Sequence, residues 1–409
     1  MADGTLAGHR EWLRRAAGLA RAGGSEVARA AVAANHASLA VACGDPQARE
    51  LVAALPDGPP AGCREHAARG LCNAADAALW RGSYQWGGEL LSAGLDLPAR
   101  IGASYTAQTA QGTRLLLDWW AGRWAGLGER CERFVADTAD MPVVAADAHL
   151  VRGVLAFVQG DWTQAVHWLT ALGAPAPECT RMPLAAATAG TLIRLALVRD
   201  DLPTAAEQAR AAWTAVAEKG IWAWAAEPAP WAVEAVARAG DAAAARRMTA
   251  EFVRGVSGQD APSARAAVAW SRAALEEYEG RHPDAAGSYR QAADAYRELS
   301  RPYARALTTE GAARCSLLGG AEHSGAPDEA ARGGADGTAG EDGGRAHTVA
   351  SLRRCVEQYT ELGAVYDAAR ARTLLRSHQP RRSAGRAAPR STTGSPPGSA
   401  RSRNSRRAA

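Results

Sequence analysis

The chain has 409 residues, and 47% of them are hydrophobic, which is enough for a large core. No uncharged apolar stretch reaches the roughly 20 residues that span a bilayer, so a membrane protein is not expected. Eleven arginines follow Asp367, the last acidic residue, so residues 1–367 hold 36 basic and 43 acidic side chains. Their net charge of −7 argues against a basic nucleic-acid-binding face on the body of the protein.

Seven cysteines are scattered along the chain without a CxxC pair, and no signal peptide opens it. An odd number of widely spaced cysteines is typical of unpaired thiols in a reducing compartment. We therefore expect a cytoplasmic protein without structural disulfides.

Turn-forming residues recur along the chain at intervals of 38 to 40 residues. Each follows an apolar helical stretch, and several precede a residue that can cap the next helix, such as Asp161 after Gly160. Glycine accepts the left-handed conformation that ends a helix, and an aspartate side chain accepts hydrogen bonds from the first N–H groups of the next one. The period therefore predicts antiparallel helical pairs. The turn residues are Gly44, Gly82, Gly122, Gly160, Asp200, Gly240, Gly280 and Gly320.

In chain order, a helix over residues 9–22 is expected to cap the N-terminal end of this array. Apolar residues spaced three and four apart, as at Leu150, Val154 and Phe157, place a stripe on one face of each helix. Because neither helix of a pair can bury its stripe alone, the pairs must stack on their neighbours. Residues 1–318 are thus predicted to form a TPR-like array, an all-α, right-handed α-solenoid of about eight helical hairpins. The pairs are expected at 25–55, 62–96, 99–138, 142–173, 180–218, 221–257 and 262–299, with 302–318 starting another.

Beyond residue 318 the pattern changes. Residues 319–346 are rich in Gly, Ala, Asp and Glu without an apolar period, which predicts a flexible loop. Residues 347–378 carry a helical stripe again and are expected to form the closing helices of the array. Arg, Ser, Pro and Gly dominate residues 379–409, which is typical of a disordered tail.

No catalytic constellation is visible in the sequence. The single lysine, Lys219, lies in EKGIW, so there is no P-loop, and the sequence also lacks HExxH and GxSxG. The nine histidines show no close metal-ligand spacing, although His149 and His167 fall in one predicted hairpin. We therefore predict no enzyme activity, no catalytic residue, no cofactor and no metal site.

The segment IWAWAAEPAPW, residues 221–231, is the strongest candidate for a binding site. Its two prolines lack N–H donors and are expected to kink or break a helix, which exposes backbone carbonyls. Trp222, Trp224, Glu227 and Trp231 flank that break and would line a groove for a ligand or partner. The alternative is ordinary packing of large aromatic side chains between repeats.

Three further tryptophans straddle the turn at Gly122. They are Trp119, Trp120 and Trp124. Their position predicts that two of them clamp adjacent hairpins, and partner binding is the alternative.

The order of several motifs along the chain resembles a known family. Over about residues 60–377, the chain resembles the C-terminal half of large ATP-dependent LuxR-type transcriptional regulators of the MalT kind. In that family a P-loop NTPase domain precedes a helical-repeat sensor, and a helix-turn-helix DNA-binding domain follows it. The motifs are GIWAWAAEPAPWAVEAVARAG (220–240), GQDAPSARAAVAWSRAALEEYEG (258–280), RPYARAL (301–307) and YTELGAVYDAARARTLLR (359–376).

The resemblance implies a sensor and protein-interaction module that regulates transcription. It would bind a small-molecule inducer or a protein partner on a helical-repeat groove. The P-loop and the helix-turn-helix are both missing from this sequence, so we expect no catalysis and no specific DNA binding by this chain alone. The alternative is a free-standing TPR-like scaffold for protein–protein assembly.

The tail suggests how a DNA-binding domain was lost. When residues 390–409, RSTTGSPPGSARSRNSRRAA, are back-translated with suitably chosen GC-rich codons, reading one base earlier gives VNDGLSPRQREVAELAAGG. That peptide resembles the opening of a LuxR-type DNA-binding domain, so we predict that the tail is a frameshifted remnant. Nucleotide sequencing across codons 376–409 tests this prediction, and codons that forbid the shifted peptide would exclude it.

Overall fold

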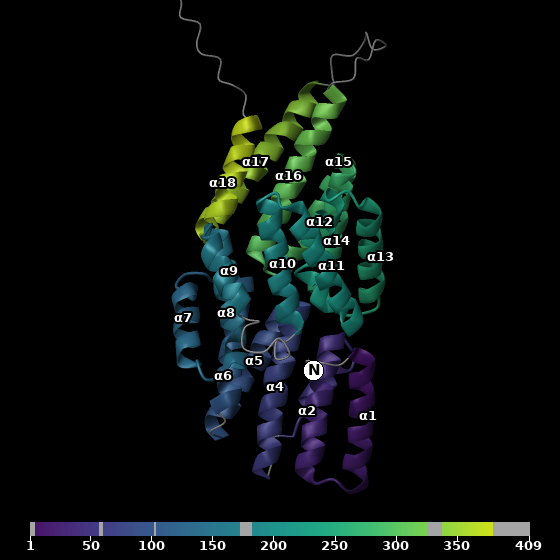
Figure 1. The fold of residues 1–409 in the computed structure, drawn as a ribbon, viewed down its shortest axis with the longest axis vertical. Helices are drawn as coiled ribbons and strands as arrows, with labels where there is room; N and C mark the ends of the chain where they lie inside the picture. The colour runs from purple at the N-terminus through teal and green to yellow at the C-terminus, as the bar shows by residue number, and fades with distance from the viewer. Residues whose placement is uncertain (1–4, 57–59, 102–103, 172–181, 325–337, 379–409) are drawn as a thin grey trace, which may run out of the picture.

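The computed structural model is all-helical (Figure 1). The described residues form eighteen α-helices and one short 3-10 helix, and none of them lies in a β-strand, which confirms the predicted all-α fold class. The tail predicted to be disordered lies outside the described residues. The structure describes the chain apart from residues 1–4, 57–59, 102–103, 172–181, 325–337 and 379–409.

Each predicted pair from 25–55 to 262–299 contains two α-helices, and in the pair at 221–257 a 3-10 helix, η2, comes before them. In the first half of the chain the helices are α1 (Leu6–Gly23), α2 (Glu26–Cys43), α3 (Ala48–Ala53), α4 (Ala61–Arg81), α5 (Tyr84–Ile101), α6 (Ser104–Trp120), α7 (Leu127–Asp137), α8 (Pro142–Gln159) and α9 (Trp162–Ala171). In the second half they are α10 (Met182–Val198), α11 (Leu202–Lys219), η2 (Trp222–Ala226), α12 (Ala229–Arg238), α13 (Ala242–Val256), α14 (Pro262–Tyr278), α15 (His282–Glu298), α16 (Pro302–Ser324), α17 (Thr338–Leu362) and α18 (Val365–His378).

Seven of the eight predicted turn residues end a helix in the left-handed conformation, with φ between 58° and 96°. At Gly82, for example, the N–H groups of Gly82 and Ser83 return to the last carbonyls of α4, as expected for a helix that ends on glycine. The Asp201 side chain then caps α11 by accepting a hydrogen bond from the Thr204 N–H at 3.2 Å. The prediction was wrong at Gly320, which lies inside α16.

The segment 319–346, predicted as a flexible loop, is helical at both ends. α16 continues to Ser324 and α17 begins at Thr338, so both predicted boundaries were wrong. Figure 1 shows these two helices projecting beyond the body of the protein. A helix that projects in this way has few neighbours to pack against, so it does not need an apolar stripe. The added residues, 319–324 and 338–346, include five glycines, so their helix propensity is low. Each segment extends a helix that already packs against the other one.

The chain curves back on itself, so that helices of its second half pack against α4 and α8 in its first half (Figure 1). α4 contacts α14, and α8 contacts α18, although these helices are far apart in the sequence. Arg81 at the end of α4 fixes one such contact. Its guanidinium donates to the Val41 carbonyl at 2.8 Å and to the Asp260 carbonyl at 2.6 Å, just before α14 begins.

A continuous buried core joins the two halves, from Ala37 in α2 to Ala371 in α18. Alanine is its most frequent residue, and small side chains let helices approach closely. Among the described helices, α8 alone has the length and apolar composition that a bilayer span requires, and 67% of that helix is buried inside the protein.

Replacing Gly82 by alanine is expected to destabilise the fold more than replacing Gly160. Both backbones are left-handed, with φ of 96° and 87°, and this conformation costs an alanine about 1–2 kcal/mol. At Gly82 the added Cβ would also lie 2.3 Å from the Ser263 Oγ, whereas at Gly160 it would meet nothing within 4 Å. Urea denaturation followed by far-UV circular dichroism measures both losses. Equal losses would mean that the contact between α4 and α14 imposes no packing constraint.

Candidate functional site

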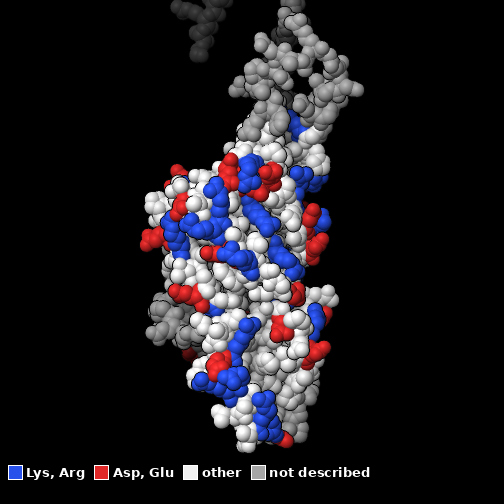
Figure 2. Space-filling model, turned by 90° about the vertical axis from the view of Figure 1, so that its right-hand side faces the viewer, with Lys and Arg blue, Asp and Glu red and all other residues white. Residues whose placement is uncertain are grey.

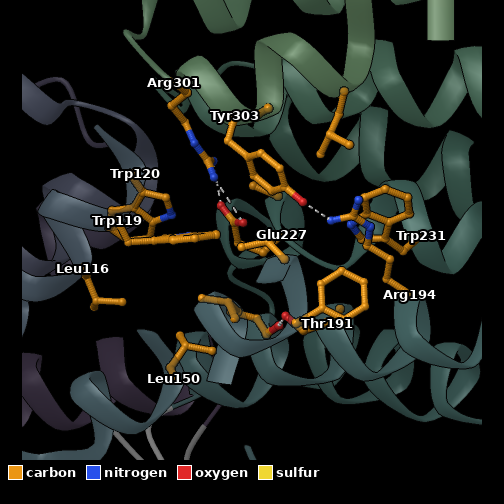
Figure 3. A pocket seen from close by; sticks show the side chains of 18 of the residues that line it. Leu116, Trp119, Trp120, Leu150, Thr191, Arg194, Glu227, Trp231, Arg301 and Tyr303 are labelled. Atoms are coloured by element: carbon orange, nitrogen blue, oxygen red, sulfur yellow. Dashed lines mark hydrogen bonds and ion pairs between the residues drawn. The ribbon is translucent and has the colours of Figure 1, made fainter. Parts of the chain in front are cut away.

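The helices that face the inside of the curved array enclose a cavity, which we call the inner cavity (Figure 3). α4, α6, α8, α10, α12, α14 and α16 all contribute to its wall. Its volume is about 80 Å³, which leaves room for a few water molecules. Aromatic rings dominate the lining: Trp80, Trp119, Trp120, Phe157, Trp231, Trp270, Tyr296 and Tyr303.

A wider space of about 470 Å³ adjoins the inner cavity, and we call it the outer cavity. Small-molecule sites in proteins occupy about 300–1,000 Å³, so the outer cavity has room for a small organic ligand and the inner cavity does not. α18, the last described helix, contributes Tyr366 and Arg370 to its wall. The two cavities share Arg194, Trp231, Trp270 and Leu307.

Glu227 and Arg301 form an ion pair in the wall of the inner cavity (Figure 3). The Arg301 Nη1 lies 2.7 Å from the Glu227 Oε1, and the guanidinium carbon lies 5.8 Å from the centre of the Trp120 ring. Burial opposes the charge of Arg301, but the Glu227 carboxylate raises the pKa of Arg301 above its ordinary value. Arg301 therefore stays charged, and the ion pair joins segments that precede α12 and α16.

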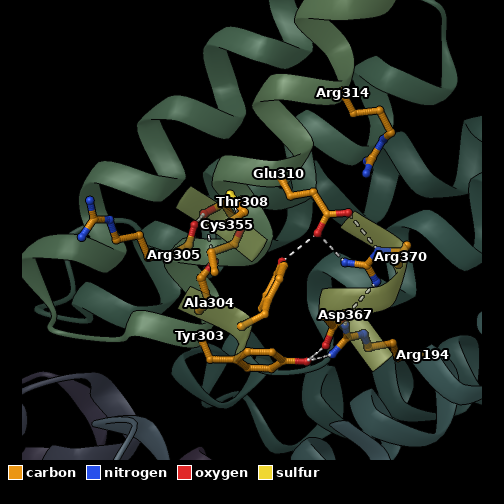
Figure 4. Close-up of polar contacts among 12 residues, drawn as sticks. Arg194, Tyr303, Ala304, Arg305, Thr308, Glu310, Arg314, Cys355, Asp367 and Arg370 are labelled. Atoms are coloured by element: carbon orange, nitrogen blue, oxygen red, sulfur yellow. Dashed lines mark hydrogen bonds and ion pairs between the residues drawn. The ribbon is translucent and has the colours of Figure 1, made fainter. Parts of the chain in front are cut away.

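Arg194 is the charged residue of the wall between the two cavities (Figures 3 and 4). Its guanidinium donates to the Tyr303 hydroxyl and, over 2.7 Å, to the Asp367 carboxylate, and the Tyr303 hydroxyl donates to the same carboxylate over 2.7 Å. The Trp231 ring centre lies 4.5 Å from the guanidinium carbon. Burial opposes the charge, but Asp367 raises the pKa of Arg194 above its ordinary value. This trio joins α10, α16 and α18.

A second buried network continues from Asp367 along α18 (Figure 4). Arg370 lies 2.8 Å from an Asp367 oxygen and donates to both carboxylate oxygens of Glu310, at 2.9 and 2.7 Å. The Tyr359 hydroxyl donates to Glu310 as well, at 2.8 Å. Because Glu310 is 1% exposed, these donors replace the water that its charge has lost. The network fixes α18 against α16 and α17.

The structure divides the four residues that were predicted to flank a groove. Glu227 and Trp231 line the inner cavity. Trp222 packs outside it, against α11 and α13, and Trp224 is buried in the core, away from the cavity lining. The expected break is confirmed, because the segment forms η2 and then α12 in place of one helix.

Sequence reasoning missed three residues of the wall, Arg194, Arg301 and Tyr303, and also Asp367, which binds Arg194 and Tyr303. The RPYARAL motif contains Arg301 and Tyr303, and that motif was the available signal. Arg194 and Asp367 are 173 residues apart, so no local spacing rule relates them.

The tryptophans around Gly122 hold a helix that is distant in the sequence. Trp119 and Trp124 stack with ring centres 4.4 Å apart, and Tyr303 at the start of α16 meets both rings edge-on, at 5.7 and 5.3 Å. Trp120 contacts Trp80 in the neighbouring α4, at 4.9 Å. The cluster therefore clamps α16 as well as an adjacent hairpin.

Other chemistry has little support in the described part of the chain. No three His, Cys, Asp or Glu side chains gather there as metal ligands. His149 and His167 both contact the Trp168 ring, with ring centres 5.2 and 5.8 Å away. Burial raises the pKa of Cys72 and Cys131 to about 12, so these thiols stay protonated and unreactive near neutral pH. The six described cysteines are free, and Cys179 lies outside the described residues.

The face that carries α1 and α13 shows arginines gathered over its upper half, with acidic side chains among and beside them (Figure 2). Several arginines of these helices and their neighbours are paired. Arg246 lies 2.6 Å from Glu279, and Arg210 lies 3.4 Å from Asp241. Such pairing is typical of a solvated charged face and not of a surface that attracts a polyanion.

Comparison with known proteins does not assign this site. No protein-family model matches the chain, and no curated protein is similar to it in sequence. The cavities and the residues around them are therefore the strongest indication of function.

Replacing Asp367 by asparagine is expected to destabilise the protein and release α18. Arg194, 5% exposed, would keep its charge without a carboxylate partner, and removing one partner of a buried ion pair costs about 3–5 kcal/mol. Urea denaturation measures the loss, and hydrogen exchange of α18 peptides localises it. Asp294→Asn is the matched control, because it removes an exposed partner of Arg297 and should leave the midpoint nearly unchanged. Equal effects of the two changes would contradict the role of the Arg194–Asp367 ion pair.

Proposed function

We propose that this chain is the sensor and protein-interaction module of a LuxR-type transcriptional regulator. Its helical pairs form a right-handed α-solenoid of about eight TPR-like hairpins, and an inducer or partner binds at the outer cavity. Binding shifts the state of the NTPase and DNA-binding domains with which the module acts. The module acts in the cytoplasm and binds its ligand without catalysing a reaction.

One observation carries this proposal: the wall of the outer cavity draws residues from α10, α12, α14, α15, α16 and α18. Arg194 in α10, Trp231 in α12 and Arg370 in α18 all line the same space. A ligand bound there contacts segments that are far apart in the sequence. Its binding energy therefore acts on how these helices pack against one another, as a sensor requires.

The charged residues of the wall support binding over catalysis. A general acid or base must reach its substrate and titrate near the working pH. Arg194 and Arg301 instead keep pKa values above their already high ordinary ones, because Asp367 and Glu227 offset the burial of their charges. Side chains of this kind hold a structure or a ligand and do not exchange protons.

A free-standing scaffold is the second candidate, and the exposed face of α1 favours it. Trp12 and Leu19 are seven residues apart on that helix and are 71% and 76% exposed. Residues at this spacing lie on one face of a helix, and large exposed apolar side chains are typical of protein contacts.

A complementation experiment tests the regulator function. The gene is deleted in its source organism and then restored as wild type, Trp231→Ala or Trp12→Ala, and transcripts are sequenced. Trp231 lines both cavities, so Trp231→Ala should fail to restore the transcripts that the deletion changes, and Trp12→Ala should restore them. Circular dichroism of the purified variants confirms that each one folds.

Two outcomes would contradict this function. Unchanged transcripts after the deletion would exclude a role in regulating transcription. Restoration by Trp231→Ala but not by Trp12→Ala would favour the scaffold, with α1 as its contact surface.

A further inference from the structure

The outer cavity carries more positive than negative charge on its wall. Arg194, Arg238, Arg314 and Arg370 line it, together with Glu234 and Glu277. This excess contrasts with the body of the chain, where residues 1–367 have a net charge of −7. An excess of cations in a partly enclosed, low-dielectric space attracts an anion.

Three arginines of this wall are partly exposed, and one of them, Arg370, stands in front of the carboxylates that partner it. The side chains of Arg238, Arg314 and Arg370 are 36%, 35% and 34% exposed. Asp367 and Glu310, which bind Arg370 from behind, are 0% and 1% exposed and do not line the cavity. A molecule that enters therefore meets guanidinium groups before it meets these two carboxylates.

Some guanidinium donors of the wall remain available. Arg314 uses its Nε and Nη2 to bind both oxygens of Glu277, and its Nη1 has no hydrogen-bond partner among the described residues. Arg238 uses Nη1 for Glu234 and Nη2 for Asp200, and its Nε has no such partner. Donors of this kind bind a carboxylate, phosphate or sulfonate group.

The rest of the wall suits a flat apolar body. Trp231 and Trp270 meet edge-to-face, with ring centres 4.9 Å apart, where the outer cavity joins the inner one. Aromatic rings present both apolar area and a geometry that favours other rings. The remaining aromatic and aliphatic lining consists of Leu197, Val198, Ala274, Tyr278, Tyr289, Leu307 and Tyr366.

We propose that the outer cavity binds a small organic anion with an aromatic body, whose acidic group is held by the arginines of the wall. This inference rests on the proposed sensor function in that it names the ligand class of the same site. Because α18 supplies Arg370 and Tyr366, the ligand also contacts the last described helix.

Two fluorescent probes that differ by one charged group test the proposal on the full chain. They are 8-anilinonaphthalene-1-sulfonate and N-phenyl-1-naphthylamine, which has the same rings without the sulfonate. The sulfonate probe should bind about tenfold more tightly or better, as expected when hydrogen bonds to a charged group are gained. Arg238→Gln and Arg314→Gln should each weaken binding of the sulfonate probe about tenfold and leave the neutral probe unchanged.

Two further variants locate the site. Arg247→Gln is the matched control, since Arg247 is an exposed arginine of α13 that does not line the cavity, and it should change neither affinity. Val198→Trp places a large ring in the cavity and should weaken both probes. Arg238 pairs with Glu234 and Asp200, whose side chains are 31% and 82% exposed, so its variant should fold and remains informative if Arg314→Gln does not.

Equal affinity for the two probes would overturn the proposal, and so would sulfonate binding that Arg238→Gln or Val198→Trp leaves unchanged. The first result would indicate a neutral ligand, and the second would indicate binding elsewhere on the surface. Failure of the proposed sensor function would give a different result. The protein would bind the sulfonate probe selectively, but deleting the gene would not change transcripts, and this outcome would keep the anion site and reject the regulator.

Discussion

Close stacking of helical pairs through small side chains is the constraint on which the rest of this structure depends. Alanines such as Ala264 and Ala267 in α14 are fully buried, so the helices approach until their backbones nearly touch. At Gly190 in α10 an added Cβ would lie 3.0 Å from the Glu227 carbonyl oxygen. Such close stacking is accompanied by tight left-handed turns, as at Gly82, and it brings the break before α12 against α10.

Curvature then brings charged residues together from distant parts of the chain. Arg81 meets Asp260, Arg194 meets Asp367, and Arg301 meets Glu227. A buried ion pair adds little net stability, because losing hydration costs about as much as the charges gain from their attraction. A wrong arrangement, however, leaves a buried charge without a partner, so these ion pairs select one closed form of the array.

Local features of the fold were predictable from the sequence and contacts between distant segments were not. The turn at Gly82 follows from chemistry within a few residues, since glycine accepts a positive φ and the preceding apolar stretch marks a helix. The prediction failed at Gly320, where α16 continues, because a glycine permits a left-handed turn without requiring one. The prediction also placed Trp222 and Trp231 in one groove. A proline break shows where a helix stops, but it does not show which neighbouring helices each side chain packs against. The partnership of Arg194 with Asp367 depends on the curvature of the array, which no local pattern encodes.

The position of α18 has a consequence for how the protein is made. Tyr366 and Arg370 are synthesised after every other residue that lines the outer cavity, and Asp367 lies between them in the sequence. A nascent chain that has folded as far as α16 therefore carries the Arg194 guanidinium without its carboxylate, in a wall that is still open. The wall of the outer cavity is complete only when the last described helix has left the ribosome, so an interrupted translation product would be an unfinished array with part of its aromatic interior exposed to water.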